Sequence, residues 1–240
     1  HLDSAAVVDA NVTLTHRAHL ATLPFVPASP AELEALDRQL ATLIVVGTDS
    51  EQPLWRDWQG YENLTAAYLR GLVALRLGRD DEALLWAATL DTLRTVRDTG
   101  SAARDLAAGL RARIARRQGD PAAALALLEA TARQVPLGLH WHNVITGQPA
   151  ERLLRADLLL AVGRPAEAQR WYASLENGIN VHLGPVADLG QARALAQQGR
   201  ADEAATLFDR FLTAMADCDP GFAPLVAKTR EERVALRVGA

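Results

Sequence analysis

A six-residue motif that opens on glycine recurs four times along this 240-residue chain, and it constrains the fold more than any other feature. The copies are GRDDEA from Gly78, GDPAAA from Gly119, GRPAEA from Gly163 and GRADEA from Gly199. Each glycine ends an apolar stretch with helical spacing, and each motif opens a second such stretch. The stretches that end at the glycines are residues 68–77, 106–118, 153–162 and 186–198. This self-similarity predicts a stack of helical hairpins.

The residue types of the motif suit a turn between two helices. Glycine has no Cβ, so it adopts the left-handed backbone conformation that commonly ends a helix. Acidic residues and prolines follow where the first turn of a second helix favours them, namely Asp80, Asp120, Pro121, Pro165 and Asp202. The last motif position is always alanine, at Ala83, Ala124, Ala168 and Ala204. A small side chain there lets the two helices approach, and we expect a bulky one to force them apart.

Composition supports an all-helical fold and argues against nucleic acid as a partner. Ala, Leu and Arg are abundant, aromatic residues are few, and such a composition favours closely packed helices. The basic residues are nearly all arginine, with Lys228 the one lysine, which is typical of a GC-rich genome. The formal net charge is −4, whereas non-specific binding to phosphates requires an excess of basic residues.

Cysteine usage and hydropathy leave the compartment open. The single cysteine, Cys218, cannot form an internal disulfide, and it suits either a bacterial cytoplasm or a periplasm. The most apolar run, residues 40–47, is far shorter than the roughly 20 residues of a membrane span, so we expect no membrane insertion of this chain. The chain begins at His1 without a methionine, from which we expect it to be a processed product or part of a longer protein.

The motif resembles the tetratricopeptide repeat over about residues 61–216. Four further residues fall on positions of that repeat's consensus: Gly71, Pro136, Tyr172 and Phe208. The chain departs from the consensus in lacking the early large aromatic residue of the first helix, and its spacings of 41, 44 and 36 residues are longer than usual. The resemblance implies a right-handed α-solenoid that binds proteins.

From Glu151 onward the chain looks like the C-terminal repeat regions of bacterial signalling proteins, which accompany kinases and transcriptional activators in GC-rich genomes. This resemblance implies a non-catalytic scaffold or regulatory module without a cofactor. The chain lacks a Gly-rich phosphate loop and the HRD and DFG motifs of kinases. A permanently docked structural subunit of a larger, possibly membrane-bound, complex is the alternative.

The flanking segments predict a three-part organisation. Residues 1–60 are expected to form an N-terminal helical cap, residues 61–216 four hairpins, and residues 217–240 a C-terminal capping helix. Within the cap, Ser29 and Glu32 predict a helix over residues 30–46, whereas residues 5–23 could be helical or extended. Trp55 and Trp58 are expected to pack the cap onto the first repeat.

The resemblance also implies a partner-binding groove lined by the first helix of each hairpin. Its candidate residues are Tyr68, Arg76, Arg113, Arg116, Arg117, Asp157 and Arg193. Because arginine suits carboxylates, the groove is predicted to bind an acidic peptide or acidic protein surface. The alternative is that these arginines are solvated and pair with nearby Asp105, Asp120 or Asp157.

Two irregular segments, residues 137–150 and 177–184, interrupt the repeats and form a second candidate surface. Trp141, Asn143 and His182 are its candidate contact residues, although these segments could simply cover gaps between hairpins. We expect no metal site, because histidines occur in pairs such as His16 and His19, without the further ligands that zinc requires. We expect no catalytic residues either, because acidic pairs such as Glu231 and Glu232 are explained as solvated surface.

Overall fold

The computed structural model describes residues 2–43, 53–93, 101–131, 145, 148–175 and 182–236. Within them the chain forms eleven α-helices and one short 3-10 helix, and no strand. The chain divides into two compact units, His1–Gln148 and Pro149–Ala240. Among the described helices, none combines the length and apolar character that crossing a membrane requires. The all-helical prediction is confirmed.

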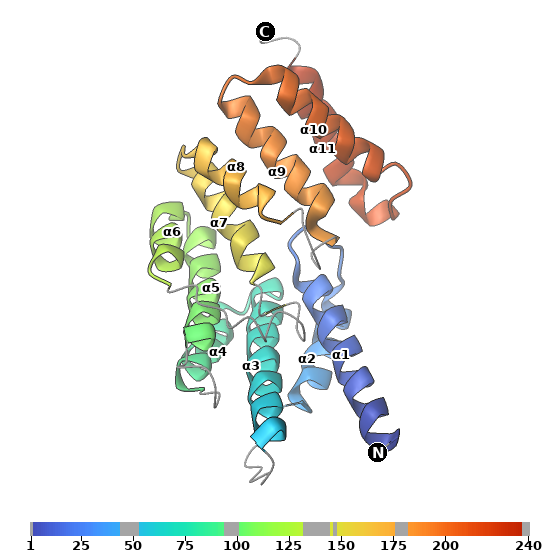
Figure 1. The fold of residues 1–240 in the computed structure, drawn as a ribbon, viewed down its shortest axis with the longest axis vertical. Helices are drawn as coiled ribbons and strands as arrows, with labels where there is room; N and C mark the ends of the chain where they lie inside the picture. The colour runs from blue at the N-terminus through green and yellow to red at the C-terminus, as the bar shows by residue number, and fades with distance from the viewer. Residues whose placement is uncertain are drawn as a thin grey trace. The chain divides into compact units, whose positions relative to one another are not determined.

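The first unit consists of three helical hairpins (Figure 1). They are formed by α1 (Leu2–Thr22) with α2 (Pro30–Ala41), α3 (Pro53–Arg76) with α4 (Asp80–Thr92), and α5 (Ser101–Arg117) with α6 (Pro121–Glu129). First helices lie side by side, α1 against α3 and α3 against α5, while α2 also packs on α3 and α4 on α5. This arrangement is that of an α-solenoid.

The second unit repeats the pattern with two hairpins and a closing helix (Figure 1). The hairpins are α7 (Pro149–Ala161) with α8 (Pro165–Ala173) and α9 (Gly184–Gln197) with α10 (Ala201–Ala214). The 3-10 helix η3 (Pro220–Phe222) leads into α11 (Ala223–Ala235), which packs on α10 as the first helix of another hairpin would. The predicted terminal helix therefore exists.

The four motif glycines end their helices as predicted. Their φ angles are positive, between 75° and 85°. The amide of the residue after each glycine donates a hydrogen bond to the carbonyl five residues earlier, for example Arg79 N to Ala74 O at 2.8 Å and Arg200 N to Leu195 O at 3.0 Å. This Schellman arrangement satisfies carbonyls that would otherwise have no partner at the helix end.

The second helices start in two different ways. At α6, the Asp120 carboxylate accepts a hydrogen bond from the Ala123 amide at 2.8 Å, which confirms the predicted cap. At α8 and α10 an arginine precedes the helix and makes two hydrogen bonds to the glutamate three residues later. Arg164 Nε lies 2.6 Å from Glu167 Oε1, and Arg200 repeats the pairing with Glu203. GRPAEA and GRADEA thus place a hydrogen-bonded ion pair where GDPAAA places a side-chain cap, whereas Arg79 of GRDDEA hydrogen-bonds to Glu34 on α2 at 2.8 Å.

The closing alanines of the motif lie in the hairpin interfaces, as predicted. Ala83, Ala124, Ala168 and Ala204 are all fully buried. Gly71 allows a similar approach between two first helices, because a Cβ built there would lie 2.5 Å from Leu110 Cδ1. Small residues therefore mark the closest contacts of the stack.

The N-terminal segment differs from the expected cap, because α1 and α2 form a complete hairpin. α1 is helical through the part that could have been extended. Ser29 and Glu32 form the predicted capping box, but α2 ends at Ala41, before the expected residue 46. The hairpin turn has no glycine motif, which explains why the repeat pattern does not detect it. The side chains of Trp55 and Trp58 lie outside the described residues.

The three-part division of the chain stays a prediction. α3 runs across its boundary at residues 60 and 61, and the two compact units meet at residues 148 and 149, within the predicted repeat region. The right-handed coiling also stays a prediction.

Candidate functional site

Tyr68 is not a surface residue, in contrast to its predicted place in a groove. Its side chain is fully buried, and it belongs to the core cluster of the first unit together with Leu72. Ile145, which precedes the second unit in the chain, is 1% exposed and belongs to the same cluster. Gln148, three residues later, also contacts the first unit's helices, because its Nε2 donates a hydrogen bond to Asp105 Oδ2 on α5 at 3.3 Å. The apolar positions of α3 are therefore core residues.

Arg76 and Arg117 hold neighbouring hairpins together. Each stands two residues before a motif glycine, and each donates to backbone carbonyls at the end of the preceding first helix. Arg76 reaches Leu23 O at 2.7 Å and Val26 O at 3.0 Å, and burial lowers the pKa of its guanidinium. Arg117 reaches Leu75 O at 2.8 Å and Asp80 Oδ1 at 2.7 Å. A cation at a helix C-terminus is favourable because unpaired carbonyls carry partial negative charge.

Replacing Arg117 by alanine should destabilise the first unit by about 1–2 kcal/mol, because a charge-assisted hydrogen bond and a half-exposed ion pair are lost together. Urea unfolding followed by circular dichroism measures the change. Arg38, an exposed residue in the last turn of α2, is the matched control, and its alanine variant should unfold like the parent. Equal unfolding free energies of the two variants would contradict the inference that Arg117 holds neighbouring hairpins together.

The three arginines of α5 have separate surroundings, although the sequence placed them on one face. Arg113 is partly buried and donates to Gly109 O at 3.0 Å within its own helix. Arg116 is exposed, and Arg117 hydrogen-bonds to the preceding hairpin. The aspartate that Arg117 contacts is Asp80, which is not among the three partners expected for these arginines.

Asp157 and Arg193, the predicted groove residues of the second unit, are also engaged. Asp157 Oδ1 accepts a hydrogen bond from the Tyr172 hydroxyl at 2.6 Å, which joins α7 to α8. Arg193 on α9 makes two hydrogen bonds to Glu232 on α11, at 2.7 and 3.0 Å. The interpretation of Glu232 as solvated surface is therefore wrong, because its carboxylate pairs with a residue 39 positions away.

A pocket of about 560 Å³ opens beside the Arg193–Glu232 pair. Apolar side chains dominate its lining, with Phe208 buried at 2% exposure. The complete lining is Leu160, Arg193, Ala196, Gln197, Gly199, Ala201, Phe208, Glu232, Ala235 and Leu236. The volume falls within the range of natural ligand pockets, about 300–1,000 Å³. The predicted groove residue Arg193 lines this pocket, and we take the pocket as the candidate site.

Helix ends of both signs lie at the pocket. Its lining includes the last turns of α7, α9 and α11, at Leu160, Gln197 and Ala235, and the first residue of α10, Ala201, where the helix carries a partial positive charge. A helix C-terminus carries roughly half a negative charge. Arg193 and Glu232 offset one another, so the side chains add no net charge. Gln197 is exposed and makes no side-chain hydrogen bond within the described part of the chain.

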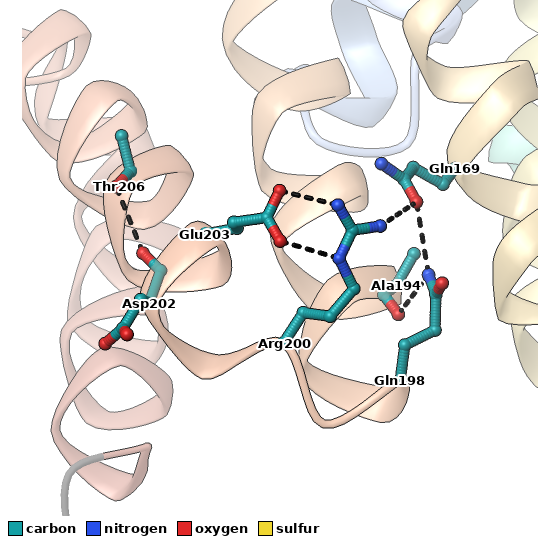
Figure 2. A network of polar contacts seen from close by, with 7 residues as sticks. All are labelled: Gln169, Ala194, Gln198, Arg200, Asp202, Glu203 and Thr206. Carbon is teal, nitrogen blue, oxygen red and sulfur yellow. Dashed lines mark hydrogen bonds and ion pairs between the residues drawn. The ribbon is translucent and has the colours of Figure 1, made fainter.

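A polar network fixes the turn on which the pocket is built (Figure 2). Gln169 on α8 accepts from Gln198 Nε2 at 3.2 Å and from Arg200 Nη1 at 3.4 Å, which ties the α9–α10 turn to the preceding hairpin. Arg200 in turn pairs with Glu203, and its hydrogen bonds hold the pKa of the Glu203 carboxyl below its ordinary value. This network positions Gly199 and Ala201 at the pocket edge.

The second candidate surface is only partly visible. Trp141 and Asn143 lie outside the described residues, and His182 is a partly buried residue just before α9. His16 is exposed and His19 is buried, so the two imidazoles do not share an environment. No cluster of three or more potential metal ligands occurs in the portion of the chain that the structure covers.

Sequence signals for the pocket were weak. Its apolar residues repeat the composition of every hairpin, and α11 lacks the glycine motif that aligns the other helices. The sequence around Glu232 gives no sign that its side chain pairs with Arg193 on α9. The pocket forms where α7, α9, α10 and α11 pack together, and the motif alone does not specify this packing.

Comparison with known proteins supports the repeat assignment. The family described as tetratricopeptide repeat matches residues 110–144 and 153–221, which include α9, α10 and the pocket residues Leu160 to Phe208. No curated protein matches the chain, and no solved structure does. The matched stretches include the hairpin turns at Gly119, Gly163 and Gly199, whereas the hairpin that turns at Gly78 lies outside them.

Proposed function

We propose that this chain, whose residues 110–144 and 153–221 match the tetratricopeptide repeat family, is a non-catalytic protein-interaction module that contacts a protein partner through the pocket of its second unit. Tetratricopeptide repeats generally serve protein–protein interaction, and the described residues supply a concave, largely apolar site within such repeats. The choice of this surface as the contact site rests on a single observation, the presence of the pocket.

The biological setting belongs to the same proposal. The resemblance to repeat regions of bacterial signalling proteins supports a scaffold or regulatory role in a bacterial multiprotein system. An acidic partner is less well supported than the sequence indicated. Three of the predicted groove arginines donate hydrogen bonds to carbonyls or carboxylates of the chain itself, namely Arg76, Arg117 and Arg193. A partner carboxylate that bound these donors would have to displace contacts that stabilise the fold.

Site-specific cross-linking tests the proposed function. A photo-reactive benzophenone amino acid at Gln197, on the pocket edge, should cross-link a specific protein in extract of the source organism. The same group at Lys228, an exposed position of α11 outside the pocket lining, serves as the control and should not capture that protein. Equal capture from both positions would place the contact elsewhere, and capture from neither would argue against a protein-binding pocket.

A permanently docked structural subunit is the second candidate, and one observation favours it. Leu84 and Leu85, adjacent on α4, are 42% and 69% exposed. Exposed neighbouring leucines are typical of an interface that is covered in an assembly. Under this alternative the chain copurifies with a partner in fixed stoichiometry, and a Leu84→Gln, Leu85→Gln double variant loses that partner.

A further inference from the structure

We propose that the pocket of the second unit takes a large apolar side chain from a protein segment that carries a lysine or arginine next to it. This inference rests on the proposed function and adds the chemistry of the partner. Four features of the pocket support it: its lining, the internal pairing of its charges, the helix ends around it, and an exposed amide at its edge.

The lining selects an apolar group. Leu160, Ala196 and Phe208 come from three different helices, and Ala235 and Leu236 at the end of α11 complete the apolar wall. A large aliphatic or aromatic side chain entering a volume of about 560 Å³ would remove apolar surface from water on both partners. Such a buried anchor is the usual centre of a binding site between proteins.

The ionisable side chains do not favour an acidic partner. Arg193 donates twice to Glu232, and both side chains are partly buried, at 33% and 26% exposure. An incoming carboxylate would compete with Glu232 for the same donors and would lie close to it. Breaking a paired, partly desolvated arginine away from its carboxylate is costly, because the released carboxylate loses its partner.

The helix ends favour a cation beside the apolar anchor. The last turns of α7, α9 and α11 meet at the pocket, at Leu160, Gln197 and Ala235. Three such C-termini outnumber the single helix N-terminus at the pocket, that of α10 at Ala201, so the partial charges of the helix ends sum to a negative value. A lysine or arginine flanking the anchor would lie in this field, whereas an aspartate or glutamate would be repelled.

Gln197 provides a place to hold the peptide backbone. It is the last residue of α9, it is exposed, and it lines the pocket. A carboxamide has both an acceptor oxygen and a donor NH₂ group, so it can pair with the N–H and the C=O of an extended segment. The second unit therefore offers a site for an apolar side chain, a negative electrostatic potential for a basic residue and a hydrogen-bonding group for the peptide backbone.

Selection from a displayed library of random linear peptides on the full chain tests this inference. Enriched peptides should share a large apolar residue with an adjacent lysine or arginine. Affinity of a synthetic representative should fall roughly tenfold or more on Ala235→Trp, which fills the pocket at an exposed position. Ala227→Trp on the same helix, exposed and outside the lining, should leave affinity unchanged. Replacing the peptide's basic residue by glutamate should weaken binding roughly threefold or more.

Three outcomes would overturn the inference. They are enriched peptides with acidic flanks, enriched peptides that bind Ala235→Trp as well as the parent, and no enrichment over a blank surface. None of these decides whether the chain contacts a cellular protein, which the cross-linking at Gln197 measures separately. Circular dichroism of both tryptophan variants checks that the helical fold is retained.

Discussion

Replacing Gly190 by alanine is expected to destabilise the second unit by about 1–3 kcal/mol, the cost of overpacking a dense interior. Gly190 lies in the middle of α9, and a Cβ built there would overlap the ring of Tyr172 on α8. That ring cannot easily withdraw, because Tyr172 is 2% exposed and its hydroxyl donates to Asp157 at 2.6 Å. Urea unfolding gives the size of the effect, and hydrogen exchange should rise in peptides from α8 and α9.

The same helix supplies a matched control. Gly184 is the first residue of α9, and apart from its two chain neighbours and the backbone of its own helix a Cβ there meets no atom within 4 Å. Gly184→Ala should therefore cost less than Gly190→Ala, although Pro185 disfavours the helical conformation in the residue before it. A Tyr172→Leu substitution, which removes the ring, should reduce the cost of Gly190→Ala. Strict additivity of the two changes would contradict the proposed overlap.

Local features of this fold could be predicted from sequence because their causes are local. A motif glycine needs only its own left-handed conformation and the helix it ends, so Gly78 and Gly199 indicated the hairpins before any packing was known. Asp120 and the Ser29–Glu32 box likewise act within one helical turn. The α1–α2 hairpin was missed because its turn contains no such signal.

Long-range partners could not be predicted in the same way. The position of Arg117 on a helix face is readable from spacing, but its contact with Leu75 O depends on how closely two hairpins stack. Arg193 presents the same difficulty, since its partner Glu232 lies on α11, beyond the last motif. Arginine is suited both to binding partners and to capping helix ends. Only the packing of neighbouring helices distinguishes these uses.

Replacing Tyr68 by alanine should lower the stability of the first unit by about 3–5 kcal/mol, the cost of removing a large aromatic side chain from a core. Tyr68 is fully buried in a cluster that joins α1 to α5 and includes Ile145. A groove residue that contacts a partner would behave differently, because its removal would weaken binding and spare the fold. Urea unfolding of the full chain, with hydrogen exchange of peptides from α3 and α5, measures the loss.

Leu85 provides the contrast within the same unit. Its side chain is 69% exposed on α4, so Leu85→Ala removes little buried surface and should shift stability by less than about 0.5 kcal/mol. Near-parent stability of Tyr68→Ala would mean that the apolar face of α3 is open to a partner in solution. A large loss confined to the first unit, together with near-parent stability of Leu85→Ala, would instead assign Tyr68 to the core and remove it from the residues available to a partner.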